Sequence, residues 1–224
     1  MRGRSDMRAT LLAAARAWLL LHALMLALAA LAAPAEAQVP PEAWAWRAEL
    51  AESAYERFGP GAPVATLAAQ VHQESAWRPN AVSHAGAQGL TQFMPGTARD
   101  MAERFARDCA PANPFDPVWA LRCRDHYLHS LMRALRPMGS GLDECARWTF
   151  ALRAYNGGAG WVQRDRRAAQ QAQAEPDSPE QVARFNAGRS PANFRENVEY
   201  APRIYRLQPR YASWGRAVCR EASR

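Results

Sequence analysis

The chain has 224 residues, and neither a long Gly/Ser linker nor an internal repeat divides it, so one large domain is expected. The formal net charge is +7, and every basic residue is an arginine. A basic surface favours anionic partners, but the arginines are scattered among acids, and no helix-turn-helix, zinc-finger or RNA-stacking motif occurs. These features argue against a nucleic-acid partner.

The N-terminal segment has the pattern of a secretory signal. Arg2, Arg4 and Arg8 precede an apolar run from Trp18 to Ala33, and Ala35-Glu36-Ala37 forms a small-x-small cleavage site. Residues 1–37 are therefore predicted to be a cleaved signal peptide, and residues 38–224 an exported or periplasmic domain without stable membrane insertion. An uncleaved membrane anchor is the alternative.

Helical spacing and capping residues predict a mainly α fold, because convincing β alternation is absent. Asp116 is expected to cap a helix that begins at Pro117 and runs through Leu135. The side chains expected to be buried on that helix are Val118, Leu121, Leu128, Leu131 and Leu135. The other predicted helices span Pro41–Arg57, Pro63–Trp77, Pro95–Arg107, Leu142–Tyr155 and Phe194–Tyr211.

Two segments between these helices lack helical signals. The stretch from Pro79 to Gly89 is rich in small and turn-forming residues, and it predicts an ordered loop that folds back over the preceding helix. The stretch from Arg164 to Ser190 is polar and contains Pro176 and Pro179, so it is expected to be broken and mobile.

Glu74 stands out because it continues an apolar stripe. Val64, Leu67 and Val71 recur at helical spacing, and Glu74 takes the place where another apolar residue would follow. A carboxyl group at the end of a core-facing stripe is costly unless it is paired or functional. From Ser75 through Arg99 the chain has no Asp or Glu, so no second acid follows it in sequence.

The chain has four cysteines, which suggests two disulfides in an exported protein, since the compartment beyond the inner membrane is oxidising. Three connectivities are open. The preferred one joins Cys109 to Cys123 across a short proline-containing loop and Cys145 to Cys219, tying the C-terminal tail to the body. No C-x-x-C occurs, so no metal site is expected.

Three blocks of sequence resemble the catalytic core of the soluble lytic transglycosylases, relatives of goose-type lysozyme that cleave bacterial peptidoglycan. They stand in the family's order and span about Pro63 to Leu207. The first block combines Glu74-Ser75 with Gly86-Ala87-Gln88-Gly89-Leu90-Thr91-Gln92-Phe93-Met94-Pro95, the second is Ala154-Tyr155-Asn156-Gly157-Gly158, and the third is Glu196-Asn197-Val198-Glu199-Tyr200-Ala201-Pro202-Arg203-Ile204. Thr91 departs from the apolar residue usual in the family, which puts local packing in doubt.

The resemblance implies a lysozyme-like single catalytic domain with a substrate groove and no cofactor. It also implies that Glu74 protonates the glycosidic oxygen and then accepts the proton of the sugar's own C6 hydroxyl, leaving a 1,6-anhydro-N-acetylmuramic acid (MurNAc) end. Ordinary glycosidases use a second carboxylate. An intramolecular nucleophile removes that need.

The resemblance further places seven residues along the groove. Ser83 and Gln92 would contact substrate or orient the acid, although Ser83 could instead cap a turn. Tyr155 would offer its ring to a sugar and its hydroxyl to Glu74. Glu196 could brace the site or be an exposed first-turn acid. The full set of expected substrate-binding residues is Ser83, Gln92, Met94, Tyr155, Asn156, Glu196 and Tyr200.

Two other functions remain open from the sequence. A hydrolytic muramidase would admit water and leave reducing ends, and an inactive wall-binding or assembly protein would retain only the groove. The expected partner is the peptidoglycan glycan strand. The sequence leaves open whether an envelope-spanning secretion or conjugation apparatus is also involved.

Overall fold

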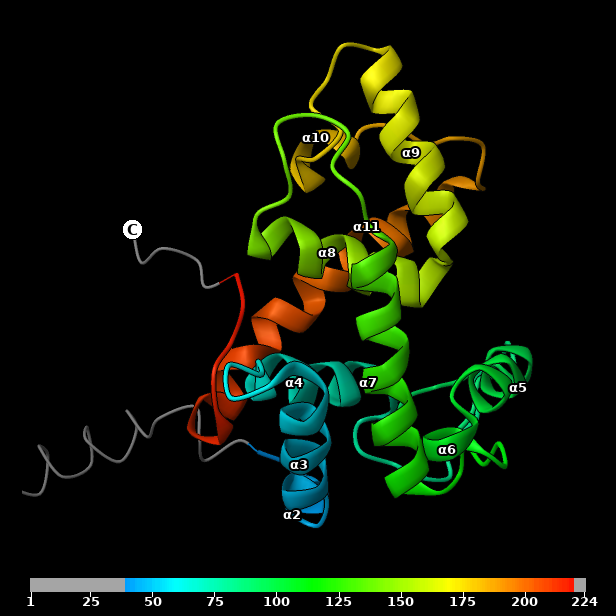
Figure 1. The fold of residues 1–224 in the computed structure, drawn as a ribbon, viewed down its shortest axis with the longest axis vertical. Coiled ribbons are helices and arrows are strands. Elements are labelled where there is room, and N and C mark those ends of the chain that lie inside the picture. Colours follow the sequence, from blue (N-terminus) through cyan, green and yellow to red (C-terminus); the bar gives the residue numbers. More distant parts are fainter. Residues whose placement is uncertain (1–38, 220–224) are drawn as a thin grey trace, which may run out of the picture. The chain divides into compact units, whose positions relative to one another are not determined.

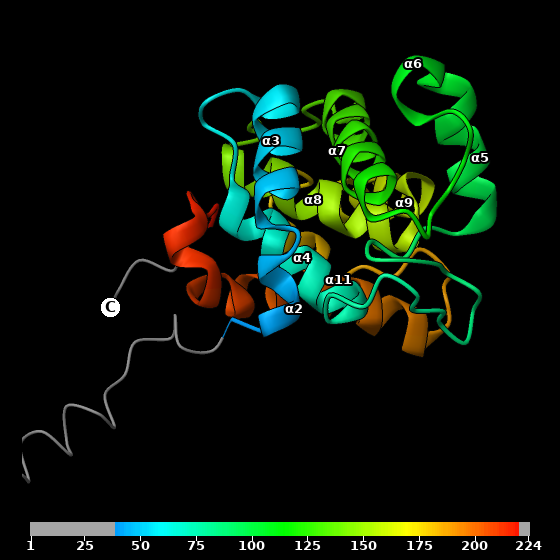
Figure 2. The ribbon, with the colours of Figure 1, turned by 90° about the horizontal axis from the view of Figure 1, so that it is seen from below.

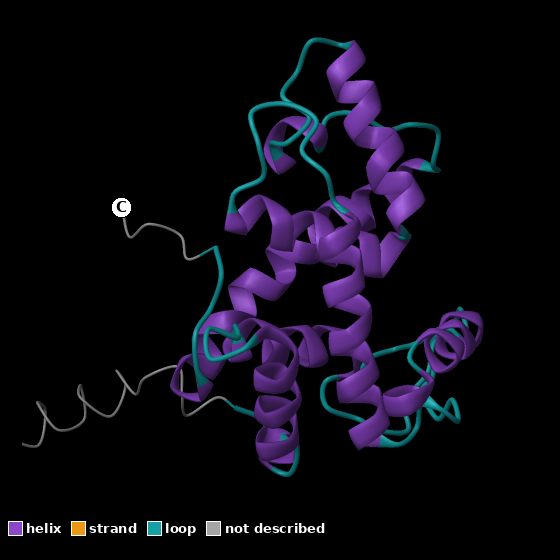
Figure 3. Ribbon diagram, viewed as in Figure 1, coloured by secondary structure: helices purple, strands orange, loops and turns teal. Residues whose placement is uncertain are grey.

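The structure is a computed structural model that describes residues 39–219, so the predicted signal peptide lies outside the described residues. Apart from two isolated β-bridges, at Val82 with Gln88 and at Gln88 with Phe93, the regular structure of this part is helical (Figure 3). The elements are α2 (Pro41–Trp44), α3 (Arg47–Phe58), α4 (Val64–Ser75), α5 (Pro95–Arg104), α6 (Ala106–Cys109), α7 (Pro117–Ala134), α8 (Glu144–Gly157), α9 (Ala159–Gln171), α10 (Pro179–Val182), α11 (Pro191–Leu207) and the 3₁₀ helix η2 (Gln208–Trp214).

Capping residues set several of these boundaries. The Asp116 carboxylate accepts hydrogen bonds from the backbone N–H groups of Val118, at 2.8 Å, and Trp119, at 3.2 Å, and Pro117 is the first residue of α7, as predicted. The helix expected over Pro41–Arg57 is instead two helices, because Trp46 has φ −112° and ψ 3° and interrupts the helical backbone. The first of these, α2, is a single turn.

The central helix is α4, whose residues from Val64 to Val71 are all buried. It packs against α3, α11 and η2, and Figure 2 shows α3, α4 and α11 next to one another. Burial on every side explains why this helix has an apolar composition nearly all round. The packing fixes the direction in which its last turn, with Glu74, leaves the core.

The helix α7 packs against α3 and α8. Leu121, Leu128, Leu131 and Leu135 are buried as predicted, with Leu135 just beyond the end of the helix. The prediction for Val118 is wrong, since its side chain is 37% exposed. Trp119 and Ala120, in the same first turn, are buried, so Val118 lies on the side of the helix that faces away from its neighbours.

The segment Arg164–Ser190 is more ordered than its composition suggests. Its first eight residues belong to α9, which lies with α10 at one end of the described part in Figure 1. Arg166 is fully buried, pairs with Asp177 and donates to the carbonyls of Pro176 and Arg136, both at 2.9 Å. Paired buried charges hold this segment where apolar residues are few, and its mobility stays a prediction.

The structure has two disulfides, which decide among the three connectivities that the sequence left open. Cys109 is bonded to Cys123, which joins α6 to α7, and Cys145 is bonded to Cys219, which ties the C-terminal segment to α8. The preferred connectivity is therefore confirmed. Within residues 39–219, no helix has the length and apolarity that a bilayer crossing requires.

Candidate active site

Glu74 lies in the last turn of α4, where the chain reverses into the loop that leads to α5. The helix ends because Ala76 and Trp77 adopt left-handed backbone conformations, with φ of 49° and 64°. The hydroxyl of Ser75 donates to the carbonyl of Leu90 at 2.8 Å and holds the returning loop against the helix. The loop folds back beside Glu74, as the sequence predicts.

A glycine is required where this loop meets the rest of the fold. Gly89 has φ 77°, and a Cβ atom at this position would lie 1.7 Å from the carbonyl oxygen of Pro114. Only glycine permits both this backbone conformation and this approach. The contact fixes the loop against the segment that precedes α7.

Tyr200 is the side chain that binds Glu74. Its hydroxyl, on α11, donates to Oε1 of Glu74 and accepts a hydrogen bond from Nε2 of Gln70 at 3.2 Å. Gln70 and Glu74 stand one turn apart on the same face of α4. The carboxyl group is thereby oriented by a short polar chain, while Glu74 remains partly exposed.

The environment raises the pKa of Glu74 from its ordinary value of 4.5 to about 7. Burial is the main cause, since it disfavours the charged form, and the negative charge of Glu196 adds to it. The hydrogen bond from Tyr200 and the positive charge of the buried Arg124 act in the opposite direction. A large fraction of Glu74 is therefore protonated at neutral pH and able to donate a proton.

Tyr155, on α8, does not make the hydrogen bond to Glu74 that the sequence suggested. Its hydroxyl donates instead to the carbonyl of Thr91 at 2.7 Å, and Tyr200 takes the expected role. Burial and the charge of Glu74 both raise the pKa of Tyr155, which places its hydroxyl in the electrostatic field of the acid. Tyr155 thus supports the loop behind the site.

The side chains of Ser83 and Gln92 are used within the loop. The Ser83 hydroxyl accepts from the N–H of Ala87 at 2.9 Å, which is the turn-capping alternative. Nε2 of Gln92 donates to the carbonyls of Gly89, at 2.9 Å, and Ala81, at 3.2 Å. These bonds shape the loop, and substrate contact by either residue stays a prediction.

Met94 is the last residue of the loop, directly before α5, and its side chain is 45% exposed. A flexible thioether at this level of exposure can adapt its shape to an apolar sugar face. Its contact with substrate also stays a prediction.

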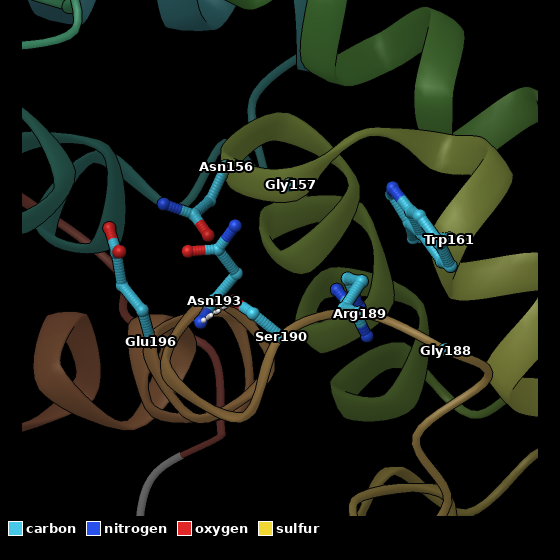
Figure 4. Close-up of a pocket in the computed structure, with 8 residues that line it drawn as sticks. All are labelled: Asn156, Gly157, Trp161, Gly188, Arg189, Ser190, Asn193 and Glu196. Carbon is cyan, nitrogen blue, oxygen red and sulfur yellow. Dashed lines mark hydrogen bonds between the residues drawn. The ribbon is translucent and has the colours of Figure 1, made fainter.

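Asn156 and Glu196 lie together at the edge of a cavity of about 450 Å³ (Figure 4). Asn156 Oδ1 accepts from Nδ2 of Asn197 at 3.0 Å, and that nitrogen also donates to the carbonyl of Arg153 at 2.7 Å. Glu196 is exposed and pairs with no cation among the described residues. The cavity does not include Glu74, but Glu196 borders the cavity one turn before Tyr200 on α11, and Tyr200 donates to Glu74, so the two regions adjoin.

Sequence reasoning missed three residues of this region. Gln70 could have been found, because it is a polar residue one turn before Glu74 on an otherwise apolar helix. Arg124 and Asn197 are buried and reach the site from α7 and α11. No local signal marks Arg124, and Asn197 belongs to the third sequence block, where nothing local indicates that it is buried. In the part of the chain that the structure describes, no three His, Cys, Asp or Glu side chains are grouped as metal ligands would be.

The fold and the site define a helical domain with a glutamate of raised pKa in the last turn of its central helix. The chain belongs to the family described as the Transglycosylase SLT domain, which matches residues 54–178. This confirms the predicted family. The mainly α fold is also confirmed by the helical structure and by its likeness to solved lytic transglycosylases.

Curated relatives are similar over half of this chain. A membrane-bound lytic murein transglycosylase F of Shewanella pealeana is 32% identical over 119 residues, which are 53% of this chain and 22% of the relative. A protein of the same name from Histophilus somni is 34% identical over 112 residues, or 50% of this chain and 21% of the relative. The chain spans about a fifth of the length of these relatives.

Two solved structures share the fold. An inactive mutant of the lytic transglycosylase Slt from Pseudomonas aeruginosa matches with a TM-score of 0.52 and 24% identity, covering 72% of this chain and 23% of the other. The 70 kDa soluble lytic transglycosylase Slt70 from Escherichia coli matches with a TM-score of 0.53 and 22% identity, covering 77% and 26%. The aligned part corresponds to about a quarter of each larger protein.

Proposed function

We propose that the protein is an exported lytic transglycosylase that cleaves the β-1,4 bond between MurNAc and N-acetylglucosamine (GlcNAc) in peptidoglycan without water. The observation that carries the proposal is the state of Glu74, a partly exposed carboxyl group whose pKa is raised to about 7 and which Tyr200 orients. A general acid is most effective when its pKa lies near the working pH. Membership of the transglycosylase family supports the choice of substrate.

The reaction needs one carboxyl group in two roles. Protonated Glu74 donates its proton to the glycosidic oxygen, the bond from that oxygen to the anomeric carbon breaks, and positive charge develops at the carbon. The C6 hydroxyl oxygen of the same MurNAc then bonds to the anomeric carbon, and its proton passes to the Glu74 carboxylate. The 1,6-anhydro end forms, GlcNAc leaves with a free hydroxyl, and Glu74 is again protonated.

Glu196 has an electrostatic role in this proposal. Its charge raises the pKa of Glu74, so it helps the acid to keep a proton until the glycosidic oxygen arrives. When Glu74 loses that proton in the first step, the hydrogen bond from Tyr200 stabilises the carboxylate until the second step. The two neighbours therefore act on opposite protonation states.

We extend the proposal to the place of action. Both disulfides require an oxidising compartment, and peptidoglycan lies outside the inner membrane. Residues 1–37 are proposed to be the cleaved signal that directs the chain there, and 38–224 the catalytic domain. Peptidoglycan glycan strands are the proposed partner.

The purified protein should be incubated with isolated sacculi and the released fragments analysed by mass spectrometry. Fragments with anhydro ends, lower in mass by one water molecule than reducing ends, are expected from the wild type and absent from Glu74→Gln. Reducing ends would instead indicate a muramidase, and binding without cleavage a wall-binding protein. Glu103→Gln, a surface change on α5, is the matched control and should cleave normally.

A further inference from the structure

Gln70 is a polar side chain inside the buried part of α4. Every residue from Val64 to Val71 on this helix is buried, and Gln70 is 1% exposed. Its Nε2 donates to the hydroxyl of Tyr200 at 3.2 Å, whereas its Oε1 has no hydrogen-bond partner among the described residues. A buried amide with an unpaired oxygen is costly, and an apolar side chain of similar size would remove that cost. The chain keeps the amide although it lowers stability, which indicates a role in the site.

The hydroxyl of Tyr200 has two side-chain partners, and they use different parts of it. Tyr200 is 4% exposed, and burial raises its pKa well above the ordinary value of 10, so the hydroxyl keeps its proton. Gln70 donates to the hydroxyl oxygen, and the one hydroxyl proton is given to Glu74. If Gln70 presented its carbonyl oxygen instead, Tyr200 would donate to Gln70 and turn its proton away from Glu74. The NH₂ group of Gln70 therefore sets the direction in which Tyr200 donates.

The direction of this donation decides which oxygen of Glu74 carries the acidic proton. Oε1 of Glu74 already accepts the proton of Tyr200, so in the protonated acid the proton resides on Oε2. Oε2 bonds to no described residue, and it is not one of the buried atoms that lack a partner, so it is the accessible oxygen of this partly exposed side chain. A proton on Oε2 is available to a glycosidic oxygen, whereas a proton on Oε1 would compete with the hydrogen bond from Tyr200.

We propose that Gln70 is a positioning residue, which acts through Tyr200 to keep the acidic proton of Glu74 on Oε2, where the substrate can take it. This inference rests on the proposed function. Gln70 is buried one turn before Glu74, so it does not touch the substrate. Its loss should therefore lower kcat and leave the apparent KM unchanged, and the loss should depend on the hydroxyl of Tyr200.

The first test is a double-mutant cycle on isolated sacculi with Gln70→Met and Tyr200→Phe. Gln70→Met keeps the length of the side chain and should lower kcat about fivefold, the effect of one hydrogen bond. In the Tyr200→Phe background the same change should alter kcat by less than about twofold, because the hydroxyl through which Gln70 acts is gone. A merely structural role would give the same loss in both backgrounds.

Gln208→Met is the matched control for the removal of a buried amide. Gln208 is 4% exposed, and its Nε2 donates to another hydroxyl on α4, that of Thr66, at 2.9 Å. It makes no hydrogen bond to Tyr200 or Glu74. Its replacement should lower the free energy of unfolding and leave kcat unchanged.

Infrared spectroscopy tests the position of the proton without cleavage, and it does so even if Gln70→Met does not fold. At acidic pH, the difference between the spectra of a protein with Glu74 and the same protein with Glu74→Gln contains the carbonyl stretch of protonated Glu74. This band should move to higher frequency in Tyr200→Phe, and by less in Gln70→Met, because the hydrogen bond to the Oε1 carbonyl is lost or weakened.

The outcomes separate this assignment from the proposed function. An unchanged band in Tyr200→Phe, or equal losses of kcat from Gln70→Met in both backgrounds, would overturn the assignment of Gln70 while a wild type that forms anhydro ends upholds the proposed function. If the wild type does not cleave sacculi, the proposed function fails, and the infrared bands alone decide whether Gln70 and Tyr200 keep the proton on Oε2.

Discussion

Replacing Glu74 by glutamine should stabilise the folded protein at alkaline pH. The carboxyl group is held in a site that disfavours its charge, and burial is the main cause of its raised pKa. Glutamine has nearly the same shape and cannot ionise, and its carbonyl can still accept the hydrogen bond from Tyr200. The substitution therefore removes the cost of the charge and keeps the contact.

The size of this stabilisation, and the pH range over which it develops, follow from the shift of the pKa of Glu74 from 4.5 to about 7. Below 4.5 both the folded and the unfolded chain hold the proton, so Glu74 contributes no pH dependence. Between these two values the unfolded chain releases the proton and the folded protein retains it, so the free energy of unfolding of the wild type falls as pH rises. Above pH 7 the loss is complete and amounts to about 3 kcal/mol.

The measurement is chemical denaturation of the wild type and Glu74→Gln between about pH 4 and pH 8. The difference in free energy of unfolding between the two proteins should grow by about 3 kcal/mol across this range, which corresponds to roughly 6 to 12 °C in melting temperature for a domain of this size. Glu103→Gln, on the surface of α5, should follow the wild type. A constant difference between wild type and Glu74→Gln would show that the carboxyl group is not held neutral, and the argument for a proton donor would fail.

Two further predictions concern the acid's neighbours and the covalent links. In pH–rate profiles on sacculi, Tyr200→Phe should move the alkaline limit of activity to higher pH, because the hydrogen bond from Tyr200 lowers the pKa of Glu74. Glu196→Gln should move this limit to lower pH, because the charge of Glu196 raises the same pKa. Shifts of both variants in the same direction would contradict both assignments. Replacing Cys145 and Cys219 by serine removes the link between residues 74 positions apart and should lower the free energy of unfolding by about 4 kcal/mol relative to the oxidised wild type, measured by chemical denaturation; equal stability of the two proteins would contradict this role of the disulfide.

Much of the fold could be predicted because its signals are local. Asp116 followed by Pro117 marks the start of α7, and the apolar spacing of Val64, Leu67 and Val71 marks α4, since caps and helical stripes act within a few residues. The break at Trp46 was missed because nothing in its sequence neighbourhood forbids a helix. Trp46 packs against the hydrophobic core, and a sequence pattern does not contain such tertiary contacts.

The buried charges could not be predicted for a related reason. The polar residues Asp165 and Arg166 look like a solvated surface when only their own helix is considered. Their partners are Arg153, Arg189 and Asp177, which lie on other elements and cancel the cost of burial only after the chain has folded. Composition gives the charges but not their pairing, and the pairing decides whether the segment is ordered.

The two tyrosines of the candidate site show where the limit of sequence reasoning lies. Tyr155 and Tyr200 both lie in segments that border Glu74, and each carries a hydroxyl that could reach the acid. The choice depends on the rotation of α8 and α11 about their axes. Tyr155 is turned toward the returning loop and donates to Thr91, whereas Tyr200 faces Gln70 and donates to Glu74. A motif therefore identifies the segments that meet at a site, but only packing determines which side chain hydrogen-bonds to the acid.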